Sequence, residues 1–313
     1  MSLSGPPPLP PGTAVAPGYR LMEHLSRGRA LDVYDAWSEE RGARCIVKAL
    51  RPDRADDRPA ARRLIAEGRL LRRLSHPHIV RGYEVLVAPA PVVVMETLTG
   101  ATLAHLIDEA PRRLSFAEIG HLGLHLASAI GYLHRQGWLH LDLKPTNVVA
   151  EAGRAKLIDL SIARRPGRTS GGVGTWCYMA PEQSTGGDLG PAADVWGLGA
   201  VLYEAVTGEA AFDVPGEREE SDPPASADGA DGWGTSREDT DPRDRRYPQL
   251  EGPAPSVRRL RRRVPPPLAD LVGACLERDP ARRPTVPQAF ATLEEVARPG
   301  LAERSWSVRE SSS

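Results

Sequence analysis

The stretch His140-Leu141-Asp142-Leu143-Lys144-Pro145-Thr146-Asn147 carries the chemistry around which the rest of the chain is arranged. It sets a carboxylate (Asp142), an ammonium (Lys144) and a carboxamide (Asn147) at fixed offsets, and Pro145 restricts the backbone between them. Phosphoryl transfer from ATP needs an Asp to accept the proton of the acceptor hydroxyl, a Lys to offset charge on the moving group, and an Asn to hold a metal ion. A short polar turn after a helix could carry the same residues by chance, so their expected partners must be sought elsewhere in the chain.

The composition is that of a globular protein with no strong overall charge. The 313 residues suffice for about two domains or one large one, and the net charge of −1 favours neither nucleic acid nor an anionic membrane as a partner. Three widely spaced cysteines (Cys45, Cys177, Cys275) fit a reducing cytosol. No apolar run reaches the ~18 residues of a membrane span, and the start of the chain has no signal pattern. We therefore expect a cytoplasmic protein.

The stretch around Asp142 resembles the catalytic loop of protein kinases, whose common form is H-R-D-L-x-x-x-N, with Leu141 where that pattern has Arg. Asp159-Leu160-Ser161 begins 17 residues after Asp142, where the family has D-F-G. The metal-binding carboxylate is retained there, while Leu and Ser replace Phe and Gly. The resemblance therefore implies that Asn147 and Asp159 bind Mg²⁺.

Gly174-Thr175, followed by Tyr178-Met179-Ala180-Pro181-Glu182, is similar to the substrate-docking region of Ser/Thr kinases. In that arrangement Thr175 would hydrogen-bond Asp142 and Lys144, and Arg283 would be the partner of Glu182. The alternative for Thr175 is a solvated loop residue.

Leu141 has a consequence for regulation. Kinases with Arg at this position hold a buried positive charge that pairs with a phosphorylated residue of the activation segment. Leu141 cannot form such a pair, so we expect activity that does not depend on phosphorylation of Thr169 or Ser170. Arg164 and Arg165 could still offer a weaker phosphate site.

Residues 19–25 and 31–37 are expected to be strands joined by Ser26-Arg27-Gly28-Arg29-Ala30. In a kinase this connection is the phosphate-covering loop, G-x-G-x-x-G-x-V. Ser26, Gly28 and Leu31 stand at its three Gly positions and Val33 follows, so only the middle glycine is retained. Since Gly lets a backbone approach a phosphate closely, this loop should cover ATP less closely.

Lys48 is one of only three lysines among 40 basic residues, and it ends Cys45-Ile46-Val47-Lys48, which is similar to the V-A-I-K pattern. A helix over residues 58–74 places Glu67 on the same face as Leu64 and Leu71. The resemblance implies that Glu67 pairs with Lys48, an exposed lysine of the cleft, which contacts the α- and β-phosphates. The alternative is a partly exposed Glu at the edge of the apolar stripe.

Residues 91–96 are expected to form a buried strand that leads into a hinge at residues 97–100. The resemblance makes Met95 the gatekeeper beside the adenine pocket, with backbone groups around Glu96 and Leu98 bonding the adenine edge. An ordinary core Met is equally compatible with this pattern.

The expected organisation is a Pro-rich disordered leader (1–18), an N-lobe (19–98), a C-lobe (99–296) and a Ser-rich tail (297–313). Residues 213–253 lack apolar periodicity and are expected to be a disordered insertion. Five arginines between Arg258 and Arg263 are expected to be a solvated face, with a docking patch for an acidic partner as the alternative. Helices are expected over 102–109, 116–136, 194–206, 266–277 and 286–296, and the apolar one over 194–206 should be central in its lobe.

These motifs resemble those of bacterial Ser/Thr kinases of the eukaryotic-like (Hanks) type. The resemblance implies an α+β, bilobal protein-kinase fold with a small β-rich N-lobe carrying one long helix and a larger, mainly helical C-lobe. It implies ATP and Mg²⁺ as cofactors and Ser/Thr hydroxyls of proteins, including this one, as acceptors. Two rival classes are a kinase-fold scaffold without catalysis and a small-molecule phosphotransferase. The oligomeric state, a homodimer among the options, is left open.

Overall fold

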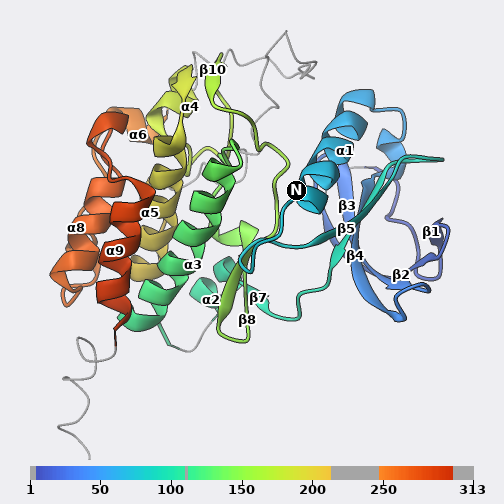
Figure 1. The fold of residues 1–313 in the computed structure, drawn as a ribbon, viewed down its shortest axis with the longest axis horizontal. Coiled ribbons are helices and arrows are strands. Elements are labelled where there is room, and N and C mark those ends of the chain that lie inside the picture. The colour runs from blue at the N-terminus through green and yellow to red at the C-terminus, as the bar shows by residue number, and fades with distance from the viewer. Residues whose placement is uncertain (1–4, 110–111, 213–246, 299–313) are drawn as a thin grey trace, which may run out of the picture. The chain divides into compact units, whose positions relative to one another are not determined.

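The strand-forming segments near the start of the chain build one antiparallel sheet (Figure 1). The computed structural model describes residues 5–109, 112–212 and 247–298. The strands are β1 (Ala14–Ala16), β2 (Tyr19–Arg27), β3 (Leu31–Ser38), β4 (Ala43–Leu50), β5 (Gly82–Leu86) and β6 (Val92–Glu96), in the order β1-β2-β3-β4-β6-β5. Their alternation of side chains creates two different faces.

One face of this sheet carries a hydrophobic cluster that includes Leu21, Tyr34 and Val47, and Leu9 and Val15 pack against it. We call it the outer face. Lys48 lies on the opposite, inner face, because neighbouring residues of a strand point to opposite sides. Helix α1 (Arg58–Arg73) packs against β4, β5 and β6, after the short 3₁₀ helix η1 (Pro52–Arg54). The side chain of Asp57 caps α1 by accepting from the amide of Ala60.

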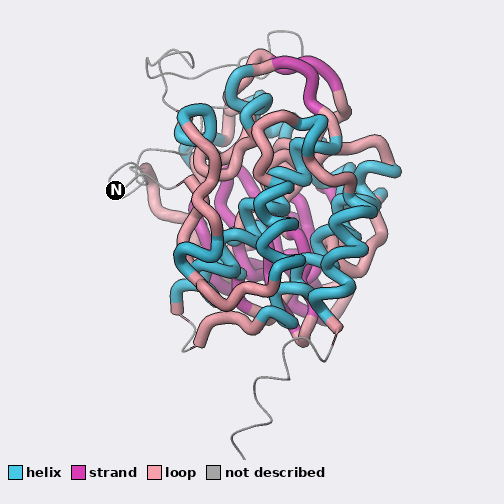
Figure 2. The backbone as a smooth tube through the Cα atoms, turned by 90° about the vertical axis from the view of Figure 1, so that its left-hand side faces the viewer, coloured by secondary structure: helices cyan, strands magenta, loops and turns pink. Residues whose placement is uncertain are grey.

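A mainly helical unit follows, in which α3, α5, α8 and α9 pack together (Figures 1 and 2). Its helices are α2 (Leu103–Asp108), α3 (Phe116–Arg135), α4 (Pro181–Thr185), α5 (Pro191–Thr207), α6 (Pro248–Glu251), α7 (Val257–Leu260), α8 (Pro266–Cys275) and α9 (Val286–Ala297), with 3₁₀ turns η2 (Pro145–Asn147) and η3 (Pro280–Arg282). Helix α5 is buried nearly all round, as its sequence predicts. A Cβ at Gly197 would lie 2.8 Å from the Cβ of Leu143, so this glycine lets α5 press against the stretch around Asp142.

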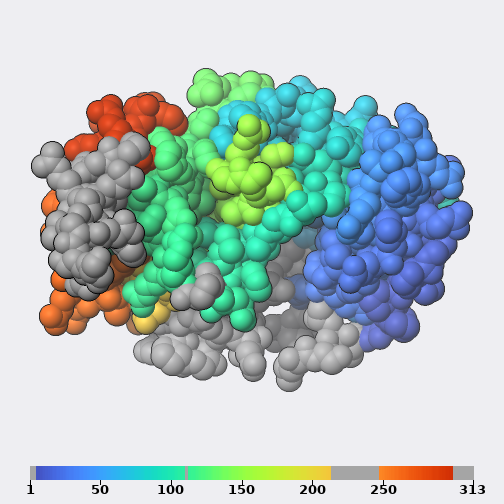
Figure 3. All heavy atoms as spheres, turned by 90° about the horizontal axis from the view of Figure 1, so that it is seen from below, coloured from blue at the N-terminus to red at the C-terminus, as the bar shows by residue number. Residues whose placement is uncertain are grey.

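Short strands complete this unit. β7 (Ala101–Thr102), β8 (Val148–Glu151) and β9 (Arg154–Leu157) form one sheet, whose β8–β9 hairpin reaches the surface in Figure 3. β10 (Gly167–Thr169) pairs with β11 (Gly187–Leu189). None of the helices in the described ranges combines the length and apolarity needed to cross a bilayer.

The chain divides into two compact units, with a boundary between Thr99 and Gly100. A strand-rich unit with one long helix and a mainly helical unit match the expected α+β architecture. One segment differs from expectation: Ile158–Ile162, placed in the C-lobe by its position in the sequence, belongs to the strand-rich unit. Asp159 is therefore grouped with the sheet and α1.

Two expectations of disorder are wrong where the structure describes the residues concerned. Within the supposed leader, Ala14–Ala16 forms strand β1, and the Leu9 amide donates to Tyr34 Oη at 3.0 Å. The prolines indicated an extended, disordered chain. Leu9 and Val15 instead pack against the apolar outer face of the sheet, and this burial orders the segment. At the end of the supposed insertion, α6 is ordered and Gln249 is buried. Residues 213–246 and 299–313 lie outside the described residues, so the predictions for them stay predictions.

Candidate active site

Lys48, Glu67 and Asp159 come together on the inner face of the strand-rich unit. Lys48 Nζ lies 2.7 Å from Glu67 Oε1 and 3.3 Å from Asp159 Oδ2. Glu67 Oε1 also accepts from the amide of Leu160 at 3.4 Å. The Lys48 side chain is only 9% exposed, which corrects the expectation of an exposed lysine. The helical stripe of α1 and the strand alternation of β4 explain this contact, since each turns its charged residue toward the other.

One ammonium faces two carboxylates in this group. Burial alone would lower the pKa of Lys48, but the charges of Asp159 and Glu67 outweigh it and raise that pKa. Burial raises the pKa of Glu67, and the charge of Asp159 adds to this while Lys48 opposes it. Glu67 Oε2 is buried and has no hydrogen-bond partner within the described part of the chain. Lys48 is thus held as a cation, and Glu67 protonates more readily than a solvated carboxylate.

Asp142, Lys144, Asn147 and Thr175 form a second group, in the helical unit. Asp142 Oδ1 accepts from the Thr175 hydroxyl at 2.6 Å and from its amide at 3.1 Å. Asp142 Oδ2 accepts from Asn147 Nδ2 at 2.9 Å and lies 3.1 Å from Lys144 Nζ. Lys144 Nζ donates to Thr175 Oγ1 at 2.6 Å. Four contacts fix the Asp142 carboxylate, and Thr175 is in contact with the charged pair, so it is not a solvated loop residue.

A buried carboxylate supports the loop that holds this second group. Asp194, from α5, accepts from the amides of His140 at 2.9 Å and Leu141 at 2.7 Å, and lies 2.7 Å from His134 Nε2. Burial alone would raise the pKa of Asp194, but the hydrogen bond and charge of His134, with those of His140, lower it. Leu141 has a φ of +67°, which is unfavourable for a residue with a Cβ. The bonds to Asp194 offset this local strain.

Two glutamines that the sequence motifs do not include donate hydrogen bonds to backbone carbonyls of the surrounding segments. Gln183 Nε2 donates to the carbonyls of Leu141 at 2.8 Å and Val173 at 2.7 Å. Gln249 Nε2 donates to the carbonyls of Trp176 and Met179, both at 3.2 Å. Gln183 directly follows the Ala-Pro-Glu motif, and an apolar pattern at residues 247 and 250 was the available signal for Gln249.

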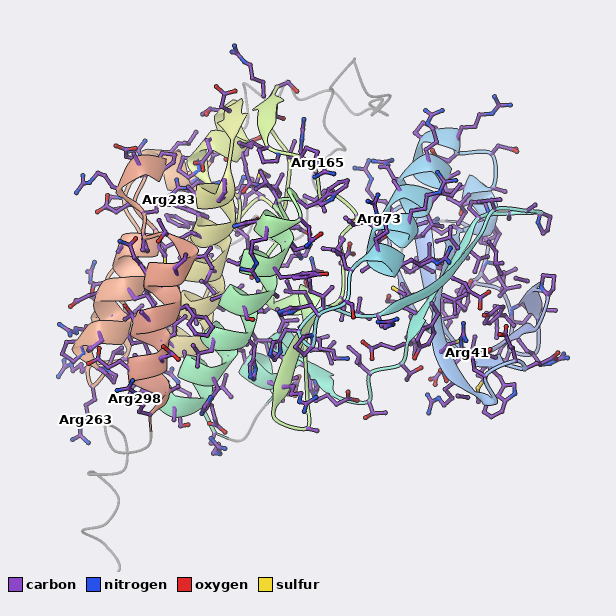
Figure 4. The ribbon with its side chains drawn as sticks, in the orientation of Figure 1. Arg41, Arg73, Arg165, Arg263, Arg283 and Arg298 are labelled. Atoms are coloured by element: carbon purple, nitrogen blue, oxygen red, sulfur yellow. The ribbon has the colours of Figure 1, made fainter. Side chains whose placement is uncertain are left out.

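The predicted pair of Glu182 and Arg283 is present and bidentate. Arg283 Nη1 and Nη2 lie 2.6 and 2.9 Å from the two carboxylate oxygens of Glu182. Figure 4 labels Arg283 among the helices of this unit. The fork of the guanidinium matches a carboxylate, which explains why Arg stands here.

The residues predicted to meet the nucleotide lie in the strand-rich unit. Val33 is directly opposite Lys48 in the β3–β4 pair, so the two side chains share the inner face. Met95 is buried opposite Ile46, and Leu98 is half-buried after β6. The Glu96 amide donates to the carbonyl of Arg81 at 3.0 Å, so an adenine contact at Glu96 would fall to its carbonyl. Gly28 lies in the β2–β3 connection, where its amide donates to the carbonyl of Leu31 at 2.8 Å.

Asn147 and Asp159 have the oxygen atoms that Mg²⁺ prefers. Asn147 Nδ2 donates both to the carbonyl and to the carboxylate of Asp142, so its amide oxygen faces the other way. The Asp159 side chain is 30% exposed, and the Ser161 amide orients it by donating to Oδ1 at 2.7 Å. Both residues fit the role of Mg²⁺ ligands.

The sequence of this chain is similar to those of known proteins. The family described as "Protein kinase domain" matches residues 19–293. The probable serine/threonine-protein kinase PkwA of Thermomonospora curvata is 30% identical over 293 residues, which cover 91% of this chain and 35% of that protein. A probable serine/threonine-protein kinase of Streptomyces coelicolor is 33% identical over 202 residues, 60% of this chain and 30% of that protein.

PknB of Mycobacterium tuberculosis, a serine/threonine-protein kinase, is 33% identical over 208 residues, which cover 62% of this chain and 33% of that protein. The matched regions thus span about a third of the length of these curated relatives. Because the family match covers most of the chain and both residue groups described above, this chain belongs to the protein kinase domain family.

Proposed function

We propose that this chain transfers the γ-phosphoryl group of ATP to Ser or Thr hydroxyls of proteins. The observation that carries the proposal is the arrangement around Asp142, whose carboxylate is fixed by Thr175, Asn147 and Lys144 within 3.1 Å. A phosphoryl-transfer site needs positioned groups more than covalent chemistry, so an Asp held this firmly suits the task. The relatives named as serine/threonine kinases support the same acceptor class.

Each group has a defined role in this proposal. Asp142 orients the acceptor hydroxyl and takes its proton as the hydroxyl oxygen forms a bond to the γ-phosphorus. The bond from that phosphorus to the β–γ bridging oxygen breaks, and ADP leaves. Lys144 stabilises the charge on the transferring group, and Thr175 holds Asp142 and Lys144 together.

The strand-rich unit binds the nucleotide. Lys48, oriented by Glu67, contacts the α- and β-phosphates, and Gly28 and Val33 lie at the loop and strand that cover ATP. Met95, Glu96 and Leu98 border the adenine. Bound Mg²⁺ neutralises phosphate charge, and Asn147 and Asp159 would hold it. The three cysteines, all within the described residues, form no disulfide with one another, which favours a reducing compartment such as the cytoplasm.

The test is transfer of labelled phosphate from ATP to a generic Ser/Thr protein substrate in the presence of Mg²⁺. The wild type should transfer label to Ser or Thr, and Asp142→Asn should reduce the rate by about 10²- to 10⁴-fold, the usual contribution of a positioned base. Asp142→Asn should still bind ADP, because Asp142 belongs to the other residue group. A wild type that binds ADP but transfers nothing would support the scaffold alternative, and label on a small-molecule alcohol alone would support the phosphotransferase.

A further inference from the structure

The connection between β2 and β3 is short and has lost two of the three glycines of the phosphate-covering loop. Ser26 and Leu31 flank Gly28, so the loop has little conformational freedom of its own. The direction of its amides therefore depends on the contacts that its carbonyls make with neighbouring residues.

Arg51, just after β4, contacts this loop at three successive carbonyls. Its amide donates to the carbonyl of Ala30 at 2.9 Å, and its Nη1 lies 3.2 Å from the carbonyls of Gly28 and of Arg29. The Arg51 side chain is 4% exposed. Asp53 holds it through two hydrogen bonds, 2.9 Å to Nε and 2.8 Å to Nη2. A buried, charge-paired guanidinium thus fixes two peptide groups of the loop, and the backbone amide of Arg51 fixes a third.

The direction of the carbonyls determines the direction of the amides. In a planar trans peptide the C=O of one residue and the N–H of the next point opposite ways. With the carbonyls of Gly28, Arg29 and Ala30 turned toward Arg51, the amides of Arg29, Ala30 and Leu31 point away from it. Successive amides pointing one way form a concave donor site for an anion.

The base of the loop is held by a second ion pair, on the outer face. Arg27 donates to both oxygens of the fully buried Asp32 at 2.8 and 2.9 Å. Arg27 also donates to the carbonyl of Pro6 at 2.7 Å, so the segment before β1 contributes to this support. With both strand ends fixed, the remaining freedom lies in residues 28–30, whose carbonyls Arg51 contacts.

We propose that Arg51, oriented by Asp53, is a positioning residue that turns the amides of Arg29, Ala30 and Leu31 toward the phosphates of the nucleotide. It does not itself touch the nucleotide. This inference rests on the proposed function for the identity of the ligand, and its test does not require phosphoryl transfer.

The experiment compares ADP with adenosine, measured by isothermal titration calorimetry in the presence of Mg²⁺. Arg51→Gln removes the planar, charged fork, and Arg51→Lys retains the charge without the fork. Arg54→Gln is the matched control, because Arg54 ends the 3₁₀ helix that directly follows Arg51 and is exposed. Both Arg51 variants should weaken ADP binding about tenfold, or about 1.4 kcal/mol, and change adenosine binding less than twofold. The control should change neither affinity.

An equal loss for ADP and adenosine would show that Arg51 only maintains the fold and would overturn the inference, as would unchanged ADP affinity. If both Arg51 variants unfold, Asp53→Asn replaces them. This variant keeps the arginine but removes the charged partner that orients its guanidinium. It should weaken ADP binding about threefold and leave adenosine binding unchanged. A protein that binds ADP without transferring phosphate fails the proposed function, yet the ADP and adenosine affinities still decide the role of Arg51.

Discussion

Lys48 illustrates, at the scale of single residues, how a charged group of the candidate site becomes part of the core. Its ammonium is almost fully buried between Glu67 and Asp159. Removing one partner from a buried ion pair leaves an uncompensated charge, which costs about 3–5 kcal/mol. A residue that the sequence alone presents as dispensable for folding is therefore expected to contribute to stability.

Lys48→Met should abolish phosphoryl transfer and also lower the free energy of unfolding by about 3 kcal/mol. The raised pKa of Glu67 gives this deficit a pH dependence. A carboxyl group whose folded pKa lies above its ordinary value of 4.5 disfavours the folded state increasingly as pH rises through the folded pKa. Because Lys48→Met removes the charge that lowers the pKa of Glu67, the deficit should grow as pH rises above 4.5, as followed by urea unfolding. Lys48→Met/Glu67→Gln should recover part of it, and a pH-independent deficit would contradict this account.

Helix α3 shows how an element is fixed at its first turn. Ser115 and Glu118 form a reciprocal capping box, and Arg112 donates to both oxygens of Glu118 at 2.8 and 2.9 Å. The hydrogen bonds from Arg112 lower the pKa of Glu118 to about 2, and the Ser115 amide adds to this effect against some burial. The end of this helix leads into the stretch around Asp142, so its stability matters for the site.

Glu118→Gln should destabilise the protein by about 0.5–1 kcal/mol at pH 7, since it retains the capping geometry but loses the charge. The pKa of Glu118 is lowered on folding, so its contribution is present above pH 4.5 and is lost as pH falls toward 2. The difference between variant and wild type in urea unfolding should therefore shrink between pH 5 and pH 3. Glu109→Gln, an exposed change on another helix end, is the control. A difference that stays constant with pH would rule out the carboxylate as its source.

Two arginines of the activation segment (residues 159–182) donate to backbone carbonyls. Arg164 Nη2 donates to the carbonyl of Arg168, and Arg165 donates to the carbonyls of Gln136 and Gly137 beside the end of α3 (Figure 4). Thr169 is buried within β10, which pairs with β11. These contacts give residues 164–169 an ordered arrangement.

The Thr169→Ala, Ser170→Ala double variant should keep an initial rate on an external Ser/Thr peptide within about tenfold of wild type, which is about 1.4 kcal/mol of barrier. Phosphatase treatment of the wild type should likewise leave the rate unchanged. A lag that disappears as the protein phosphorylates itself would show that the segment needs phosphate after all.

Across the whole chain, a few buried polar contacts join segments that are far apart in sequence. Arg283 is the clearest case, because it links Glu182 with the carbonyls of Ala192, Glu277 and Arg278 within the helical unit. Arg261 has a similar role: it stacks on Phe116 at 4.0 Å and donates to the carbonyl of Leu114. Part of the arginine cluster is thus structural and not a solvated face.

Arg283→Leu should lower the free energy of unfolding by about 3–5 kcal/mol, because Glu182 and three carbonyls lose their donor in a buried site. Arg282→Leu is the matched control: its side chain is 68% exposed and it should change stability by less than about 0.5 kcal/mol. The double variant Glu182→Leu/Arg283→Leu should recover only the part of the lost unfolding free energy that comes from the unpaired Glu182 carboxylate. Full recovery in urea unfolding would mean that the bonds to the carbonyls contribute nothing.

The sequence by itself determined the longer helices and the central strands, and it indicated the two candidate groups of site residues. Asp142, Lys144 and Asn147 lie within six residues of one another, and the helical stripe of α1 and the alternation of β4 orient Glu67 and Lys48. Local periodicity and turn chemistry act over a few residues, so a sequence pattern records them directly.

Only the tertiary structure decided which residues support those groups. Arg51, Gln183 and Gln249 look like surface residues in the sequence, yet all are buried and bonded to backbone carbonyls. Leu9 lies in a Pro-rich segment but covers the outer face of the sheet. The reason is physical: whether a polar side chain is buried, and which carbonyl needs its donor, depends on segments brought together by folding, 22 to 73 residues apart in these contacts. No spacing along the chain encodes that requirement.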